Sequence, residues 1–221
     1  MRACLRDGGS WRGENAIAFL TGLGPAVEIV EGCDLFVEGS YDAAFEGVTA
    51  VFHVAAVLGN SSNNQPLGAG NVDDDTYNGG VAGTRNVLGS VEKSSTVQRV
   101  IYTSSLSAMN NSTGHWHESG YEWTEEDWAS DVTKFFPDDP DAWSNTTTAC
   151  EKIFRWLPHA PHPHPHETLR TDSKSKVDTE HMLNDAAAAS GGQWDAVTLC
   201  PGRICGPMLF GKCPCCGNVL I

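Results

Sequence analysis

Two hydroxyl side chains end a strand-like segment of the chain, where they could take part in carbonyl chemistry. The apolar run that starts at Val100 closes on Ser104 and Ser105. A serine at the end of a buried strand can donate a hydrogen bond to a substrate carbonyl oxygen. Serine also favours turns, and for this segment taken alone ordinary turn chemistry is the better explanation.

Small side chains end a second apolar run, residues 50–56. Its last two residues are Ala55 and Ala56. Small residues at the carboxyl end of a strand let a cofactor approach the backbone, and open α/β sheets bind ligands at that edge. Any core strand can also end in two alanines, so only about one such strand end in five marks a ligand site.

Lys176 and the turn at Pro201 complete the set of candidate residues. Lys176 opens a helix-like stretch, and Pro201 follows a third apolar run. A lysine at a helix start is normally a solvated charge, and a Pro-Gly pair after a strand is normally a turn. The order of these segments along the chain is therefore more informative than any one of them.

Short apolar runs alternate with helix-like stretches, and these elements must position the candidate residues. The runs are rich in Val, Ile, Ala and Phe and scarcely alternate with polar residues, as expected for strands buried on both faces. The pattern predicts an α/β fold with an open, mostly parallel sheet covered by helices. The expected strands are residues 2–5, 26–30, 50–57, 97–103 and 194–199, and the expected helices are residues 40–46, 73–94 and 174–189.

Two segments depart from this pattern. Residues 150–172 contain alternating proline and histidine, which predicts an extended chain because proline interrupts helices and interior strands. The tail, residues 211–221, is rich in cysteine. Zinc could bind the histidines and the tail cysteines together, but Cys-Pro-Cys-Cys differs from the spaced Cys-x-x-Cys pairs of structural zinc sites. We therefore expect no metal site.

Charge and hydropathy argue against two classes of partner. The 221 residues include 14 Lys and Arg against 28 Asp and Glu, a formal net charge of −14, which is the opposite of a phosphate-binding balance. We therefore expect no nucleic-acid partner. No apolar run approaches the ~18 residues of a membrane span, so no membrane partner is expected. The start of the chain does not resemble a secretory signal, which favours the cytoplasm and reduced cysteines.

Six motifs occur in an order that resembles one family, the extended short-chain dehydrogenases/reductases. The nearest branches are the dihydroflavonol-reductase-like and 3β-hydroxysteroid-dehydrogenase-like members, with NAD-dependent epimerase/dehydratases close by. The motifs are Asp-Leu at 34–35, His-Val-Ala-Ala at 53–56, Gly-Thr-Arg-Asn-Val-Leu at 83–88, Tyr-Thr-Ser-Ser at 102–105, Ser-Lys-Val-Asp-Thr-Glu at 175–180 and Pro-Gly-Arg-Ile-Cys-Gly-Pro at 201–207. The resemblance covers about residues 1–7, 26–149 and 173–210.

The resemblance implies a Rossmann-like, NAD(P)-binding domain, with helices on both faces of its sheet, that is incomplete over residues 1–210. Residues 150–172 would be an atypical insert, and residues 211–221 an atypical tail. The family's first strand leads into a Gly-x-x-Gly-x-x-Gly turn, where a helix N-terminus holds the pyrophosphate. The sequence starts at what corresponds to the second strand, and residues 8–13 are interpreted as a loop. The predicted fold therefore lacks the first strand and the phosphate-binding turn.

The resemblance also implies roles at matching positions. Ser105 would orient the substrate carbonyl, with Ser104 as the second choice, and Lys176 would bind the nicotinamide ribose and lower the pKa of a catalytic tyrosine. Arg6 corresponds to the region that meets the adenosine ribose, where an arginine suits the 2′-phosphate of NADP. A surface arginine explains Arg6 equally well, and NAD is the alternative cofactor. The implied cofactor-binding positions are Arg6, Asp34, Leu35, Ala55, Ala56, Ser104, Lys176, Pro201 and Ile204.

The chain departs from the family at the catalytic tyrosine and at one supporting residue. The tyrosine normally lies four residues before the lysine, and Asp172 occupies that position here. No tyrosine follows Tyr121. An ionised carboxyl group beside a lysine does not replace a tyrosine as proton donor, so the sequence does not identify the donor. Gly80 stands where the family usually has an asparagine.

The expected function is NAD(P)-dependent oxidoreduction of a CH–OH group on a small substrate. A secondary alcohol or its ketone is expected, and aromatic residues between positions 110 and 148 would suit a ring-bearing one. The alternative is a catalytically inactive remnant or a binding module of the same fold. A further interpretation is that residues 150–172 and 211–221 are non-native translated sequence. The family often forms homodimers, and that state stays open here.

Overall fold

The computed structural model describes residues 1–6, 11–56, 72–109, 122, 124, 128 and 165–201. Strands in this part of the chain are β1 (Arg2–Leu5), β2 (Glu28–Glu31), β3 (Ala50–His53), β4 (Arg99–Thr103) and β5 (Asp195–Leu199). Helices in the same part are α1 (Trp11–Gly22), α2 (Asp42–Phe45), α3 (Val72–Lys93), α4 (Leu106–Met109) and α7 (Pro165–Ala189). Every expected strand and helix is therefore present, all but β1 with shifted ends, and α1 and α4 are additional.

The described strands form two parallel sheets. β1 pairs with β2, and β4 lies between β3 and β5. A doubly wound sheet follows the order 3-2-1-4-5-6, and the observed strands fit this order when β1 and β3 are counted as its strands 2 and 4. No described strand then occupies the position of strand 1, between β1 and β3. This arrangement confirms the predicted parallel α/β fold and its incomplete sheet.

Arg2 connects the two sheets at one end. Its Nε donates to the Glu28 carboxylate on β2 over 2.8 Å. Its Nη1 donates to the carbonyl oxygen of Ala44, at 3.2 Å, and to that of Glu46. Because Glu46 lies shortly before β3, the guanidinium group links the start of β1 to the approach to β3.

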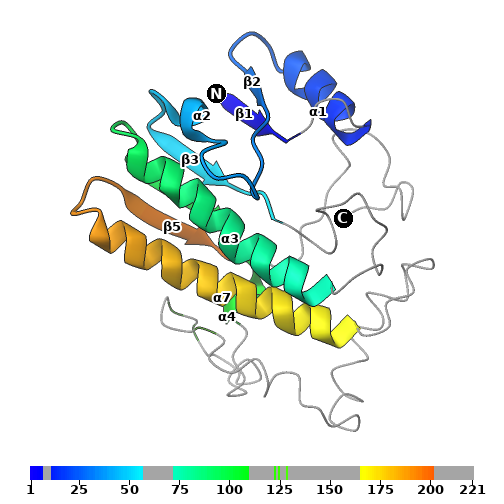
Figure 1. The fold of residues 1–221 in the computed structure, drawn as a ribbon, viewed down its shortest axis with the longest axis vertical. Coiled ribbons are helices and arrows are strands. Elements are labelled where there is room, and N and C mark those ends of the chain that lie inside the picture. The colour runs from blue at the N-terminus through cyan, green and yellow to red at the C-terminus, as the bar shows by residue number, and fades with distance from the viewer. Residues whose placement is uncertain are drawn as a thin grey trace, which may run out of the picture.

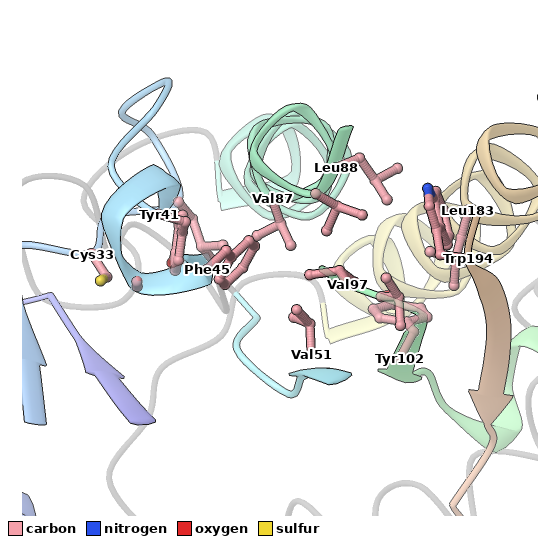
Figure 2. Close-up of a cluster of buried hydrophobic side chains, with 14 residues drawn as sticks. Cys33, Tyr41, Phe45, Val51, Val87, Leu88, Val97, Tyr102, Leu183 and Trp194 are labelled. Atoms are coloured by element: carbon pink, nitrogen blue, oxygen red, sulfur yellow. The ribbon is translucent and has the colours of Figure 1, made fainter. Parts of the chain in front are cut away.

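The core lies between helices α3 and α7 and one face of the β3–β4–β5 sheet. The two helices run side by side across this face (Figure 1). Thr84, Val87, Leu88 and Val91 are buried on α3, at the spacing that places them on one side of a helix. Leu183 projects from α7 into the same cluster (Figure 2). Packing of this apolar side therefore fixes both helices on the sheet.

The expectation of an extended chain over residues 150–172 is wrong for the part from Pro165 onward. α7 begins at Pro165 and includes residues 165–172, whereas its predicted start is residue 174. Proline is tolerated in the first turn of a helix because the first N–H groups have no helical acceptor and the ring presets φ. Residues 150–164 lie outside the described residues.

The loop expected at residues 8–13 is wrong from Trp11 onward, because α1 begins there. Residues 8–10 lie outside the described residues. The signal for this helix is the apolar run from Ala16 to Leu20, in which alanine and leucine favour helix formation. The glycines that precede the run obscure this signal in the sequence.

The approach of α7 to α3 depends on the absence of a side chain at Gly80. A Cβ on Gly80 would lie 2.0 Å from Ser175 Oγ on α7, whereas a Cβ on Gly89 of α3 would meet nothing within 4 Å. We expect G80A to lower the free energy of unfolding by about 1–3 kcal/mol through overpacking. G89A should raise it by about 0.5–1 kcal/mol, because alanine favours a helix over glycine.

Urea denaturation measures both effects, and a second substitution identifies their cause. S175A removes the hydroxyl group that a Cβ at position 80 would meet. The double variant G80A/S175A should therefore recover most of the lost stability. A double variant as unstable as G80A would show that the two helices do not meet at these residues.

The burial of Leu183 gives a second prediction. Leu183 is 0% exposed on α7, whereas Leu23 after α1 is 55% exposed. We expect L183A to lower the free energy of unfolding by about 2–5 kcal/mol, because the truncation leaves a cavity. L23A should change it by less than about 0.5 kcal/mol. Equal losses in thermal or urea denaturation would contradict the packing of α7 on the sheet.

Candidate functional site

The ends of β3, β4 and β5 bring several of the candidate residues to one edge of the sheet. Ser104 and Ser105 follow β4, Ala55 and Ala56 lie just beyond β3, and Pro201 lies just beyond β5. The three strands are parallel, so their carboxyl ends lie at the same edge. The Ser104 N–H donates to the carbonyl of the last β5 residue over 2.8 Å, which continues the pairing beyond β4.

Pro201 is held beside the residues that follow β4. The backbone N–H of Leu106 donates to the Pro201 carbonyl over 3.0 Å. This contact brings the turn after β5 next to the turn that carries Ser105. The structure therefore brings together two segments that the sequence separates by nearly a hundred residues.

Lys176 reaches this edge from α7. Its Nζ donates to the carbonyl oxygen of Thr103, the last residue of β4, over 3.3 Å. The same ammonium group lies 5.2 Å from the centroid of the Tyr102 ring, close enough for a cation–π contact. Lys176 therefore lies close to the segment that carries the serines, because Thr103 directly precedes Ser104.

His53, the last residue of β3, is a buried group of this site to which the sequence gave no role. Its Nε2 lies 2.9 Å from Thr84 Oγ1 on α3, and its ring packs against Tyr102 with centroids 5.3 Å apart. Burial, and then the positive charge of Lys176, lower the pKa of His53 to about 4. The imidazole is therefore neutral at pH 7 and ties β3 to α3.

Glu180 is a second buried group behind the serines. Its carboxylate accepts a hydrogen bond from the Ser104 hydroxyl and one from Trp128 Nε1, the latter over 2.9 Å. Cys200 Sγ lies 3.5 Å from the same carboxylate. Burial, and then the negative charge of Glu180, raise the pKa of Cys200 to about 11, so this thiol is protonated at pH 7 and is a poor nucleophile.

The candidate adenosine-binding residues lie apart, at the ends of β1 and β2. The Cys33 N–H donates to the Leu5 carbonyl over 3.0 Å, so Arg6 and Asp34 each follow a paired residue. An Asp34 carboxylate oxygen accepts the N–H two residues further on at 2.9 Å, which is an Asx-type turn. Leu35 is 9% exposed and packs against α3 at Gly83. A contact of Leu35 with adenine therefore stays a prediction.

Several predicted positions cannot be placed. Ile204, Tyr121 and the tail cysteines lie outside the described residues. Asp172 belongs to α7 and lies one helical turn before Lys176, so the position of the family's tyrosine is on the helix that carries the lysine.

Within the described ranges no group of three or more His, Cys, Asp or Glu side chains could hold a metal ion. No described helix is long and apolar enough to cross a membrane.

Two curated proteins are similar to half of this chain. Over 112 residues it is 36% identical to anthocyanidin reductase of Arabidopsis thaliana. The aligned segment covers 50% of this chain and 29% of that protein. Over 110 residues it is 30% identical to dihydroflavonol 4-reductase of Medicago sativa, which covers 50% of this chain and 47% of that protein. The match thus spans less than half the length of each relative.

Solved structures of reductases share the fold. Vestitone reductase from alfalfa superposes with a TM-score of 0.56 at 22% identity, over 96% of this chain and 60% of that one. Yeast methylglyoxal/isovaleraldehyde reductase in complex with NADPH superposes with a TM-score of 0.56 at 15% identity, over 95% of this chain and 60% of that one. At these identities the likeness concerns the fold, and it confirms the predicted Rossmann-like arrangement.

A family model matches a segment that contains the ends of β2, β3 and β4. The model of the 3-beta hydroxysteroid dehydrogenase/isomerase family covers residues 25–137. This segment is about half of the chain and contains the first four of the six ordered motifs. The chain therefore belongs to the 3-beta hydroxysteroid dehydrogenase/isomerase family.

Proposed function

We propose that this chain binds NADP(H) and belongs to an oxidoreductase that interconverts a secondary alcohol and its ketone on a small, ring-bearing substrate. The observation that carries the proposal is the contact of Lys176 with the end of β4. Its ammonium group lies on the carbonyl of Thr103, one residue before Ser104 and two before Ser105. A cation thus lies at the strand end that carries two serines, at the edge where open α/β sheets bind nucleotides.

Each of these side chains has a distinct part in such a reaction. The bound nicotinamide would supply or accept the hydride at the carbonyl carbon. The Ser105 hydroxyl would donate a hydrogen bond to the carbonyl oxygen, where negative charge develops. Lys176 would donate to the hydroxyl groups of the nicotinamide ribose. Ala55 and Ala56 are exposed and small, which leaves the end of β3 open to the nicotinamide.

The described residues fit one half of the nucleotide better than the other. The nicotinamide half fits the edge formed by β3, β4 and β5, where Lys176 and the two serines lie. No glycine-rich turn at a helix N-terminus that could hold the pyrophosphate occurs among the described residues. Arg6, exposed at the end of β1, would favour NADP over NAD through the 2′-phosphate. Pro201 would lie beside the nicotinamide ring.

The position of the family's proton donor does not carry a tyrosine in this chain, and this favours a second candidate function. Asp172 occupies the position one turn before Lys176. A carboxyl group at this position replaces the phenol that would serve as proton donor in such a reaction. A protein of this fold that binds NADP(H) without rapid turnover, as a binding module, is therefore the alternative. NADPH binding without substrate-dependent oxidation would favour it.

The role of Lys176 is tested by comparing it with its neighbour Lys174. Lys174 lies on the same helix, is 55% exposed and pairs with Asp178 over 2.5 Å. We expect K176M to weaken NADPH binding by about 10- to 100-fold, because a charged hydrogen bond to the ribose is lost. K174M should change it less than about twofold, because the lost pair is exposed. Quenching of protein fluorescence by NADPH measures both.

If K176M and K174M weaken NADPH binding equally, the loss reflects the general charge of the chain and not a contact of Lys176 with the ribose. No NADPH binding by the unaltered chain would contradict the proposed function itself. Circular dichroism of both variants checks that the fold is kept.

The position of Asp172 gives a gain-of-function prediction. D172Y places a phenol one helical turn before Lys176, where the cation can lower its pKa toward neutrality. We expect its turnover of a dihydroflavonol or an anthocyanidin, the substrate classes named for the two relatives, to exceed that of D172F by about 100-fold. The measurement is NADPH oxidation at 340 nm. Equal turnover in D172Y and D172F would show that residue 172 does not face the reacting oxygen.

A further inference from the structure

Glu180 is the most buried acidic group at the candidate site. It lies on α7, one turn after Lys176, and is 5% exposed. Its carboxylate accepts from the Ser104 hydroxyl after β4 and from Trp128 Nε1, and it lies 3.5 Å from the Cys200 thiol after β5. Three segments far apart in the sequence therefore meet at one carboxylate.

The composition of this cluster distinguishes it from an ion pair. A buried carboxylate needs hydrogen-bond donors to replace water, and within the described residues these donors are neutral. Ser104 and Cys200 both donate to Oε1, whereas Trp128 donates to Oε2, so the two oxygens face different segments.

Glu180 and Lys176 act on successive residues of the same strand end. Lys176 holds the carbonyl of Thr103, and Glu180 holds the side chain of Ser104. Ser105, the proposed partner of the substrate carbonyl, comes next in the chain. α7 therefore contacts both residues immediately before Ser105, through the backbone carbonyl of Thr103 and through the side chain of Ser104.

Trp128 is held on the other side of the same carboxylate. Its ring packs on the His181 ring with centroids 4.3 Å apart, and it also contacts the small cluster formed by Ala108 and Val177. Ala108 lies in α4, which directly follows Ser105. The tryptophan therefore rests on the helix that carries Lys176 and on the turn that carries the serines.

We propose that Glu180 is a positioning residue of the candidate site, which couples the Ser104–Ser105 strand end to Trp128. The coupling itself is a property of the apo protein, whereas its effect on substrate binding rests on the proposed function. An isosteric glutamine keeps the shape of the side chain, but in E180Q an NH2 group faces either Ser104 or Trp128 in place of the carboxylate oxygen that accepted its hydrogen bond.

The coupling is tested without any ligand by the indole N–H resonance of Trp128 in ¹⁵N NMR spectra, assigned with W128F. We expect S104A to move this resonance by more than a linewidth, because Ser104 and Trp128 share the carboxylate. The matched control is S90A, since Ser90 is also a buried serine that donates to a carboxylate, that of Asp42, at 2.5 Å. S90A should leave the Trp128 resonance in place.

A second comparison shows whether Glu180 carries the coupling. In an E180M background, which removes both acceptor oxygens, S104A should no longer move the Trp128 resonance. If E180M does not fold, E180Q replaces it, and the effect of S104A should then shrink by at least half. A Trp128 resonance that S104A leaves unmoved, or that S104A still moves fully in the E180M or E180Q background, would overturn the proposal.

Enzyme kinetics separate a positioning role from a purely structural one. We expect E180Q to raise the KM for the carbonyl substrate about tenfold, while the Kd for NADPH, held by Lys176, changes less than about twofold. A parallel loss of both would indicate general loosening and contradict positioning. If the unaltered chain neither binds NADPH nor turns over, the proposed function fails, and the NMR comparison still decides the coupling.

Discussion

The close packing of α3 against α7 is the contact on which the candidate site depends. Gly80 lets α7 approach until Ser175 is buried, and this approach places Lys176 and Glu180 against the end of β4. The two charged groups lie one helical turn apart, so they meet adjacent residues of that strand end, beginning with Thr103. A larger residue at position 80 would move α7 and both groups together.

Among the described residues no strand lies between β1 and β3, and this divides the candidate nucleotide site into two halves. The residues proposed for the nicotinamide half follow β3, β4 and β5, whereas Arg6 and Asp34 follow β1 and β2. Arg2 joins the sheets near the amino-terminal ends of the strands, away from the edge that would hold the nucleotide. Phe52 and Val54 are 70% and 60% exposed, so described residues leave the face of β3 that points away from α3 and α7 largely uncovered. A parallel strand in this position would join both halves into one edge.

Local sequence patterns predicted the strands and the edge, but not the contacts behind it. Runs of Val and Ile, as at β4, identify buried strands because their apolar residues scarcely alternate with polar ones. The start of α7 was missed because proline is compatible both with the first turn of a helix and with an extended chain. The roles of His53 and Glu180 were missed because their partners are distant: Thr84 lies 31 residues from His53, and Ser104 lies 76 residues from Glu180. No local pattern reports such pairs.

The most direct test of this account is a titration of the ¹⁵N-labelled chain with NADPH, followed by NMR. The central claim is that the nicotinamide half of the nucleotide lies at the carboxyl ends of β3, β4 and β5. It predicts saturable shifts in the amide resonances of Ala55, Ala56, Thr103, Ser104 and Ser105, together with those around Lys176. Shifts confined to other parts of the chain, or no saturable shift at millimolar NADPH, would contradict it.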